Sequence, residues 1–254
     1  MIDIIDFQCH PDLYNDKYEI IKLSDGLLKK AKEYNIGLIA MTNIPQLYKK
    51  YNNLFGDETY IKIALGYHPQ LVLEYPNEMK LFLQYIKHAR FIGEVGLDKS
   101  SYSISYIDKQ IEIFKEIIIE CNKIGKKIIS IHSRNADDII FDFLQKGSCI
   151  YILHWYTGKV NKLLAAMSKD ENIYISINLD MISTTNGRKI IEITPLSRVV
   201  LETDAPFTKK TKKVYSRDIF FETIKGIAKI KKCTFQHVID VIIDNSKRII
   251  EDNY

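Results

Sequence analysis

The sequence has 254 residues, of which 46% are hydrophobic, and a formal net charge of +4. This length fits one large domain or two small ones, and the apolar content supports a sizeable core and excludes a disordered chain. The modest positive charge does not by itself indicate a nucleic-acid partner. No apolar run reaches the roughly 18 residues of a membrane span, and the acidic start MIDIIDFQCH does not resemble a signal peptide.

The chain contains four cysteines, and none of them has the CxxC spacing of a metal or redox motif. Cys9, Cys121 and Cys149 fall within or beside apolar periodic segments. These features predict buried free thiols in a reducing compartment, and therefore a cytoplasmic protein.

Short β-rich runs alternate with longer helical segments along the chain. The expected strands are Ile2–Phe7, Gly37–Thr42, Ile61–Gly66, Phe91–Val95, Lys127–Ile131, Cys149–Leu153, Ile173–Ile177 and Arg198–Glu202. Several of these runs are apolar at consecutive positions, as is typical of parallel strands buried on both faces. The expected helices are Ser24–Tyr34, Ser105–Lys123, Asn135–Gln145, Lys159–Ser168, Asp218–Lys229 and Thr234–Ile250.

Groups able to bind a metal or transfer a proton close six of the strand-like runs. They are His10, His68, Glu94, His132, His154 and Asp204. In a parallel α/β barrel the site lies at the C-terminal rim of the strands, so this pattern predicts one (β/α)8 barrel domain over residues 1–254. An open doubly wound sheet is the alternative, but the sequence has no glycine-rich phosphate loop. Metal-assisted hydrolysis is the leading interpretation.

Taken singly, each of these residues also has a structural interpretation. Glu94 can bridge two cations or form a buried salt bridge. Arg134 can clamp a phosphate through its bidentate guanidinium, or pair at the surface with Asp137 or Asp138. Asp204 can ligate a metal or accept a proton from water. Six such groups at one predicted rim favour the metal site over the separate structural explanations.

The motifs together resemble the TatD family of metal-dependent deoxyribonucleases, which have an amidohydrolase-like barrel. The resemblance covers about residues 1–250 and rests on DFQCH, GYHP, GEVGLD, IHSR, LHWYTG and ETDAPF in the family order. HPQLV, GEVGLDKS, SIHSR and ILHWYTG also look like the TatD-like member of Qat anti-phage defence systems.

The resemblance implies a role for each site residue. Glu94 would be shared between two metals, with His132 and His154 holding one of them. The other metal would be held by His10, Asp204 and the side chain of Gln8. His68 and Arg134 would face the scissile phosphate, and Asp204 would also orient or deprotonate the attacking water. Trp155 and Tyr156 would either stack on a base or pack in the core.

The chain departs from the family pattern at three places. Gln8 stands where the family has the first histidine of HxH, and an amide oxygen suits Mg²⁺ better than zinc-like cations. Gln70 replaces a second histidine after the proline, a change that fits the Qat-like subgroup. After the last strand, the usual Arg-Asn-Glu-Pro stretch is replaced by the basic run Lys209–Lys213, which is either a solvated loop or a phosphate-attracting one.

These observations predict a hydrolase that uses one or two divalent ions (Mg²⁺, Mn²⁺ or Zn²⁺) to cleave DNA, single-stranded or with free ends. Membrane association is not expected, whereas other subunits of a defence complex are candidate partners. Two alternatives stay open. The first is an amidohydrolase-type enzyme acting on a small substrate. The second is a catalytically impaired subunit that binds nucleic acid or a partner protein, for which Gln8 is the main support.

Overall fold

The computed structural model describes residues 4–13, 27–100, 104–212 and 214–251. All eight predicted strands are confirmed, and no described end differs from the prediction by more than three residues. Their bounds are β1 Ile4–Cys9, β2 Ile36–Ala40, β3 Ile61–Ile63, β4 Phe91–Gly96, β5 Ile128–His132, β6 Ile150–His154, β7 Ile173–Ile177 and β8 Val199–Leu201. Residues 2–3 of the first predicted strand and residues 24–26 of the first predicted helix lie outside the described residues.

The strands pair in parallel with their neighbours along the chain. Three strands follow the order β1-β2-β3 and five follow β4-β5-β6-β7-β8. Single parallel bridges join Leu65 to Ile92 and Cys9 to Ala205, which link the segment after β3 to β4 and β1 to the segment after β8. This neighbour-to-neighbour order of eight parallel strands is that of a (β/α)8 barrel, as predicted.

Helices separate most of the strands. Their bounds are α1 Leu27–Tyr34, α2 Pro45–Phe55, α3 Glu78–Tyr85, α4 Ile107–Ile124, α5 Val160–Lys169, α6 Leu179–Ser183, α7 Thr185–Ile193, α8 Arg217–Lys231 and α9 Phe235–Glu251. Five of the six predicted helices are confirmed in their described parts. The short helical turns are η1 Pro11–Leu13, η3 Pro69–Leu71, η4 Ile104–Tyr106, η5 Ile140–Asp142 and η6 Leu196–Arg198.

The helix predicted over Asn135–Gln145 is wrong, because only the short turn η5 forms there. Asn135 adopts a left-handed backbone with φ +55°, which is incompatible with a helix that includes this residue. Asp137 Oδ2 accepts a hydrogen bond from the Lys159 amide at 3.0 Å, so this carboxylate stabilises the next loop instead of capping a helix. Local polar contacts therefore override the weak helical periodicity of the segment.

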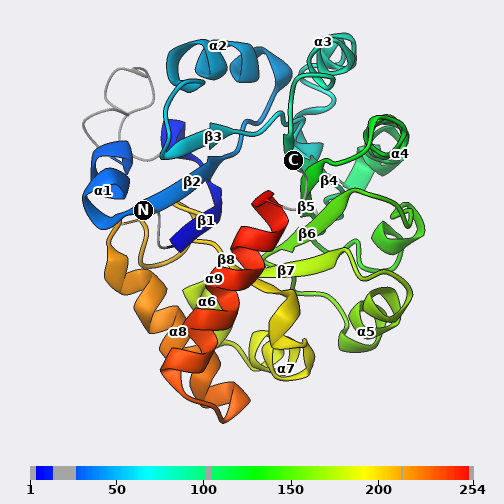
Figure 1. Ribbon diagram of the computed structural model, residues 1–254. Coiled ribbons are helices and arrows are strands. Elements are labelled where there is room, and N and C mark those ends of the chain that lie inside the picture. The colour runs from blue at the N-terminus through cyan, green and yellow to red at the C-terminus, as the bar shows by residue number, and fades with distance from the viewer. Residues whose placement is uncertain (1–3, 14–26, 101–103, 213, 252–254) are drawn as a thin grey trace. The chain divides into compact units, whose positions relative to one another are not determined.

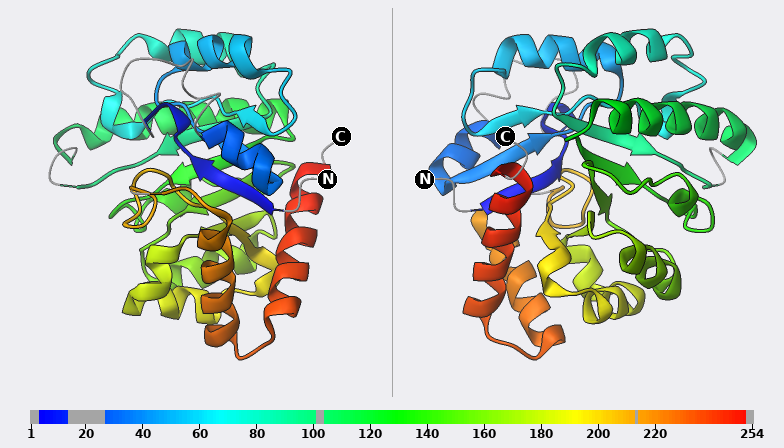
Figure 2. Two further views of the ribbon diagram at one scale, coloured as in Figure 1. Left: turned by 90° about the vertical axis from the view of Figure 1, so that its left-hand side faces the viewer. Right: turned by 45° about the vertical axis from the view of Figure 1, so that its right-hand side comes forward.

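The chain divides into two compact units. Unit 1 comprises residues 1–40, 57–62 and 175–254, and unit 2 comprises residues 41–56 and 63–174. Within unit 1, α9 lies beside α8 and packs on β1 and β8 (Figure 1). Within unit 2, α2 lies beside α3 (Figure 2), and α4 packs against β4. The single domain over residues 1–254 stays a prediction.

The longest helix of unit 2 shows how the sequence determines packing. α4 buries a stripe formed by Gln110, Ile113, Phe114, Ile117, Ile118 and Cys121, and ends at Gly125, where φ is +80°. Ile107 and Ile111, which lie near the start of α4 at helical spacing, are only half-buried. The inner face is centred on Ile113 and Ile117.

A buried lysine ties the start of β5 to the end of α3. Lys127 Nζ donates hydrogen bonds to the carbonyl oxygens of Ile86 at 2.7 Å and Ala89 at 2.6 Å. Burial lowers the pKa of Lys127. The two carbonyl acceptors satisfy an ammonium group that would otherwise be costly to bury. This contact fixes the approach to β4, which carries Glu94.

Three of the four cysteines, Cys9, Cys121 and Cys149, are buried free thiols, as predicted. Burial raises the pKa of the Cys121 thiol and of the Cys149 thiol, so both are held in their neutral, unreactive form. None of the helices in the described ranges is long and apolar enough to cross a membrane.

Candidate metal centre

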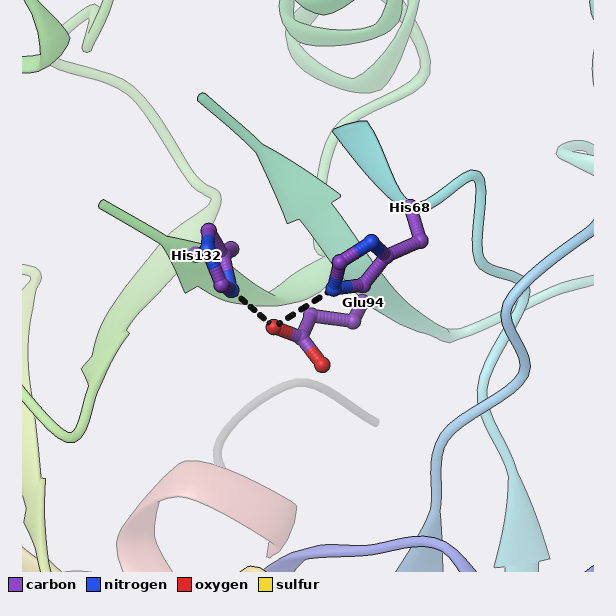
Figure 3. A group of neighbouring side chains, drawn as sticks. All are labelled: His68, Glu94 and His132. Carbon is purple, nitrogen blue, oxygen red and sulfur yellow. Dashed lines mark hydrogen bonds and ion pairs between the residues drawn. The ribbon is translucent and has the colours of Figure 1, made fainter. Parts of the chain in front are cut away.

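Two histidine side chains of unit 2 converge on one carboxylate oxygen of Glu94 (Figure 3). Glu94 Oε1 lies 2.5 Å from His132 Nδ1 and 3.5 Å from His68 Nε2. One ligand atom from each residue lies within 4.8 Å of the other two. Glu94 comes from β4, His132 ends β5, and His68 follows β3, so three neighbouring strands supply this group. Two imidazoles around a carboxylate match the donor set of a divalent transition metal.

A third histidine reaches the same oxygen. His154, the last residue of β6, is buried, and its Nε2 atom lies 3.5 Å from Glu94 Oε1. His68 and His154 therefore approach Glu94 at equal distances. The predicted division of labour, with His154 on a metal and His68 on the phosphate, stays a prediction.

Glycines bring the backbone of these strands close enough for the side chains to meet. A Cβ atom at Gly96 would lie 2.0 Å from the carbonyl oxygen of His132, and φ at this glycine is +143°. A Cβ atom at Gly66 would lie 1.7 Å from the carbonyl oxygen of Thr42. No side chain fits at either position, so both glycines are required by close backbone approach.

Asp98 is buried next to His132, and the sequence alone did not indicate it as a site residue. Asp98 Oδ2 accepts from His132 Nε2 at 2.9 Å and from the Gln70 side-chain amide at 2.8 Å. Asp98 Oδ1 accepts from the Ser100 amide at 2.7 Å. The Asp98 carboxylate thus fixes the ring of His132 with Nδ1 directed at Glu94. Carboxylates in this place hold the tautomer and orientation of metal-binding histidines.

The same network explains what Gln70 does. Its side chain donates to Asp98, and its backbone amide donates to His68 Nδ1 at 3.2 Å. Because Nδ1 of His68 accepts this hydrogen bond, the Nε2 atom carries the ring proton when the imidazole is neutral. Gln70 therefore orients both His68 and, through Asp98, His132.

The protonation of His132 reflects two opposing effects. Burial lowers the pKa of His132, but the charge of Glu94 and the hydrogen bonds to Asp98 and Glu94 outweigh it, so the pKa is raised. The cluster therefore favours an imidazolium, and any cation bound at Nδ1 must displace a proton. Metal binding at such a site is expected to weaken as the pH falls.

A second group of candidate ligands lies within unit 1. His10 Nε2 is 3.6 Å from Asp204 Oδ1 and 3.4 Å from the side-chain amide nitrogen of Gln8. All three side chains are buried. Backbone hydrogen bonds hold the group together, since the Asp204 amide donates to Gln8 O and the His10 amide donates to Ala205 O, both at 2.8 Å. An imidazole and a carboxylate with an amide group beside them form a weaker donor set for a divalent cation than the cluster around Glu94.

Asp6 anchors the chain that carries Asp204. Its carboxylate accepts from the Thr203 amide at 2.8 Å, from the Thr203 hydroxyl at 2.6 Å and from the Tyr215 hydroxyl at 3.1 Å. Burial raises the pKa of Asp6 to about 7, although these hydrogen bonds act in the opposite direction. Asp204 itself adopts φ +47°. The first motif, DFQCH, thus contributes a structural acid as well as candidate ligands.

The remaining predicted site residues lie at the surface or in the core. Arg134 is exposed after β5. The surface partners suggested for it are engaged elsewhere, since Asp138 pairs with Lys99 at 2.7 Å and Asp137 accepts from the Lys159 amide. Tyr156 is fully buried and its hydroxyl donates to the backbone, so core packing accounts for it.

Trp155 is half-buried against His154, with ring centroids 6.5 Å apart. Its φ of +38° is rare for a bulky residue and turns the chain directly after His154. Of the two aromatic residues in the LHWYTG motif, Trp155 alone therefore offers a partly open ring.

The chain is similar to known proteins over most of its length. Residues 5–251 match the family model described as "TatD related DNase". An uncharacterized metal-dependent hydrolase, BU355 of Buchnera aphidicola, is 31% identical over 80% of this chain and 81% of its own. Human deoxyribonuclease TATDN3 is 25% identical over 98% of this chain and 94% of its own.

The fold is also that of a solved relative. The TatD homologue YJJV from Escherichia coli superposes with a TM-score of 0.81 at 16% identity, covering 98% of both chains. Because the family model matches nearly the whole sequence, the chain belongs to the TatD family of metal-dependent hydrolases.

Proposed function

We propose that this protein is a metal-dependent deoxyribonuclease that hydrolyses phosphodiester bonds in DNA, single-stranded or with free ends. The observation that carries the proposal is the approach of three histidines to Glu94 Oε1, at 2.5 to 3.5 Å. The deoxyribonuclease name of the human relative TATDN3 supports DNA as the substrate class.

Each candidate residue has a defined task in this proposal. Glu94, His132 and His154 would hold a divalent cation. His68, whose Nε2 atom carries the ring proton, would face the scissile phosphate. The cation, Mg²⁺, Mn²⁺ or Zn²⁺, would polarise the phosphoryl oxygen and make water a better nucleophile. Asp98 and Gln70 would keep the His132 ring in its ligand orientation.

The group in unit 1 would supply a second, weaker position. Gln8, His10 and Asp204 offer one imidazole and one carboxylate, whereas Glu94 is accompanied by the imidazoles of His132 and His154. Asp204 would also accept the proton of the attacking water. Arg134 would bind a phosphate oxygen, because its guanidinium forms bidentate contacts.

The decisive experiment combines metal analysis with a nuclease assay. The purified protein is supplied with Mg²⁺, Mn²⁺ or Zn²⁺ and offered single-stranded DNA, duplex DNA and RNA of one sequence. We expect cleavage of DNA, and a loss of at least about 100-fold in Asp204→Asn, because a missing general base costs at least this much. DNA binding by Asp204→Asn should survive.

Matched controls separate loss of the site from general damage. Glu94→Gln should lose both metal and cleavage, whereas His88→Gln, at an exposed position after α3, should leave both unchanged. If the wild-type protein cleaves no nucleic acid with any of the three metals, and Asp204→Asn retains biological activity, the hydrolase proposal fails. The catalytically impaired subunit suggested by Gln8 is then the better explanation.

A role in anti-phage defence and the presence of partner subunits stay predictions, which rest on the motifs HPQLV and ILHWYTG. A cytoplasmic location also stays a prediction, which rests on the pattern of cysteines. Expression of the chain with its neighbouring genes, followed by a phage plaque assay with wild-type and Glu94→Gln proteins, tests the defence role. Equal plaque counts for both would argue against it.

A further inference from the structure

One exposed aromatic ring lies against a candidate metal ligand. Phe207 is 47% exposed, and its ring packs nearly perpendicular to that of His10, with centroids 5.2 Å apart. Among the phenylalanine, tyrosine and tryptophan side chains within the described ranges, Phe207 is the only exposed one. An aromatic ring that is open to solvent beside a candidate catalytic group can offer its face to a bound base.

The loop that carries Phe207 is held in a defined conformation. The Phe207 amide donates to Asp204 O at 2.7 Å, which fixes the ring three residues beyond a candidate ligand. Thr208 and Thr211 point inward and are buried, and their hydroxyl groups lie 2.6 Å apart. The Thr208 hydroxyl also donates to Thr203 O at 3.2 Å. The exposure of Phe207 is therefore built into the loop, because the threonines take the buried positions.

Lysines occupy the solvent side of the same loop. Lys209 and Lys212 are exposed, and the backbone of Lys209 is fixed by a hydrogen bond to Asp180 Oδ2 at 3.2 Å. Lys210 is engaged in an ion pair with Glu222 at 2.5 Å. Lys213 lies outside the described residues. The loop thus presents one aromatic ring followed by two solvent-facing positive charges.

We propose that Phe207 is a base-stacking platform for single-stranded nucleic acid, with Lys209 and Lys212 contacting the adjacent phosphates. Every base has an apolar face that can stack on an aromatic ring, whereas the backbone needs positive charge, and this loop supplies both. Stacking on Phe207 would place a nucleotide next to His10 and Asp204. The inference rests on the proposed nuclease function and specifies how the substrate is held there.

The flanking lysines favour a nucleotide over an apolar protein partner. A hydrophobic protein interface would need a contiguous apolar surface, and lysine is depleted in the cores of such interfaces. The proposal also reassigns the stacking role suggested for the LHWYTG motif, because Tyr156 is buried and Trp155 is only half-open.

Binding of a single-stranded oligonucleotide containing 2-aminopurine tests this without catalysis, in EDTA so that no cleavage occurs. Phe207→Leu keeps an apolar side chain over His10 but removes the aromatic face. We expect binding to weaken by about 5- to 150-fold, the range that corresponds to ~1–3 kcal/mol per stacked base. Phe207→Trp should restore affinity and the quenching of 2-aminopurine.

An abasic substitution supplies the complementary test. Wild-type protein should lose affinity when the stacked nucleotide lacks its base, whereas Phe207→Leu should bind both oligonucleotides equally. Leu54→Ala removes another exposed apolar side chain, on α2, and should change nothing. Equal affinity of wild type and Phe207→Leu, or equal sensitivity to the abasic site, overturns the inference.

The two proposals fail in different ways. If Phe207 stacks on a base but no metal supports cleavage, the stacking proposal stands and the nuclease proposal fails. If DNA is cleaved equally well with and without Phe207, the nuclease proposal stands and the stacking proposal fails. Thermal melting of each variant confirms that the fold is intact.

Discussion

Replacing Asp98 by asparagine tests whether the network behind His132 controls metal binding. The change preserves size but turns an acceptor-only group into one with two donor hydrogens. In the wild type, Asp98 Oδ2 accepts from His132 Nε2 at 2.9 Å and from the Gln70 side chain at 2.8 Å. If Oδ1 of the new side chain still accepts from the Ser100 amide, its NH₂ group takes the place of Oδ2 and faces these two donors. The Gln70 amide can rotate to present its oxygen, but His132 has no such freedom.

The expected magnitude follows from the tautomer of His132. To accept a hydrogen bond from the side-chain amide of the Asp98→Asn variant, Nε2 of His132 must lose its proton, and in the neutral ring the proton then sits on Nδ1. That atom lies 2.5 Å from Glu94 Oε1 and is the candidate ligand. Loss of such an outer partner typically costs 10- to 100-fold in metal affinity, or roughly 1.4–2.7 kcal/mol.

The assay is isothermal titration of Zn²⁺ or Mn²⁺ into metal-free wild-type and variant proteins, with circular dichroism to confirm the fold. Asp138→Asn is the matched control, because Asp138 is an exposed acid paired with Lys99 at 2.7 Å, and such pairs contribute little. Metal affinity in Asp98→Asn equal to that of the control would refute the orienting role of Asp98.

Four further predictions concern other residues. Gln8→His should raise the metal content, because an imidazole replaces an amide in the weaker donor set of unit 1. Arg134→Lys should reduce turnover on DNA with the fold intact, since an ammonium cannot form bidentate contacts. Replacing Lys209 and Lys212 by glutamine should flatten the salt dependence of single-stranded DNA binding by about 0.7 per lost phosphate contact. Lys127→Met should lower the free energy of unfolding by about 2–4 kcal/mol, because two buried carbonyls lose a charged donor.

Each of these predictions has a contrary result. Unchanged metal stoichiometry and activity in Gln8→His would count against the weak second position. Full activity in Arg134→Lys would leave Arg134 as an ordinary surface residue, and an unchanged salt slope would show that the lysines are merely solvated. Lys210→Gln is the control for the loop, because its partner Glu222 already neutralises it. A denaturation midpoint in Lys127→Met equal to that of the wild type would contradict the stabilising role of the Lys127 hydrogen bonds.

Much of the fold could be predicted from local sequence patterns. Most of the strands appear as short apolar runs because both of their faces are buried, and α4 ends at Gly125, where the chain turns with φ +80°. The segment Asn135–Gln145 could not be predicted in this way. Its backbone is determined by the left-handed conformation of Asn135 and by the hydrogen bond between Asp137 and the Lys159 amide. The periodicity of apolar residues reveals neither of these features.

The sequence by itself determined which side chains could bind a metal, because histidines and acids at the ends of apolar runs must gather where parallel strands end. Only the tertiary structure decided how they are held. Asp98, Gln70 and Asp6 act through hydrogen bonds between residues far apart in the chain, such as the 28 residues separating Gln70 from Asp98. The exposure of Phe207 was likewise decided by burial of its threonine neighbours. Spacing along a chain does not encode such contacts, because they depend on the distances that folding creates.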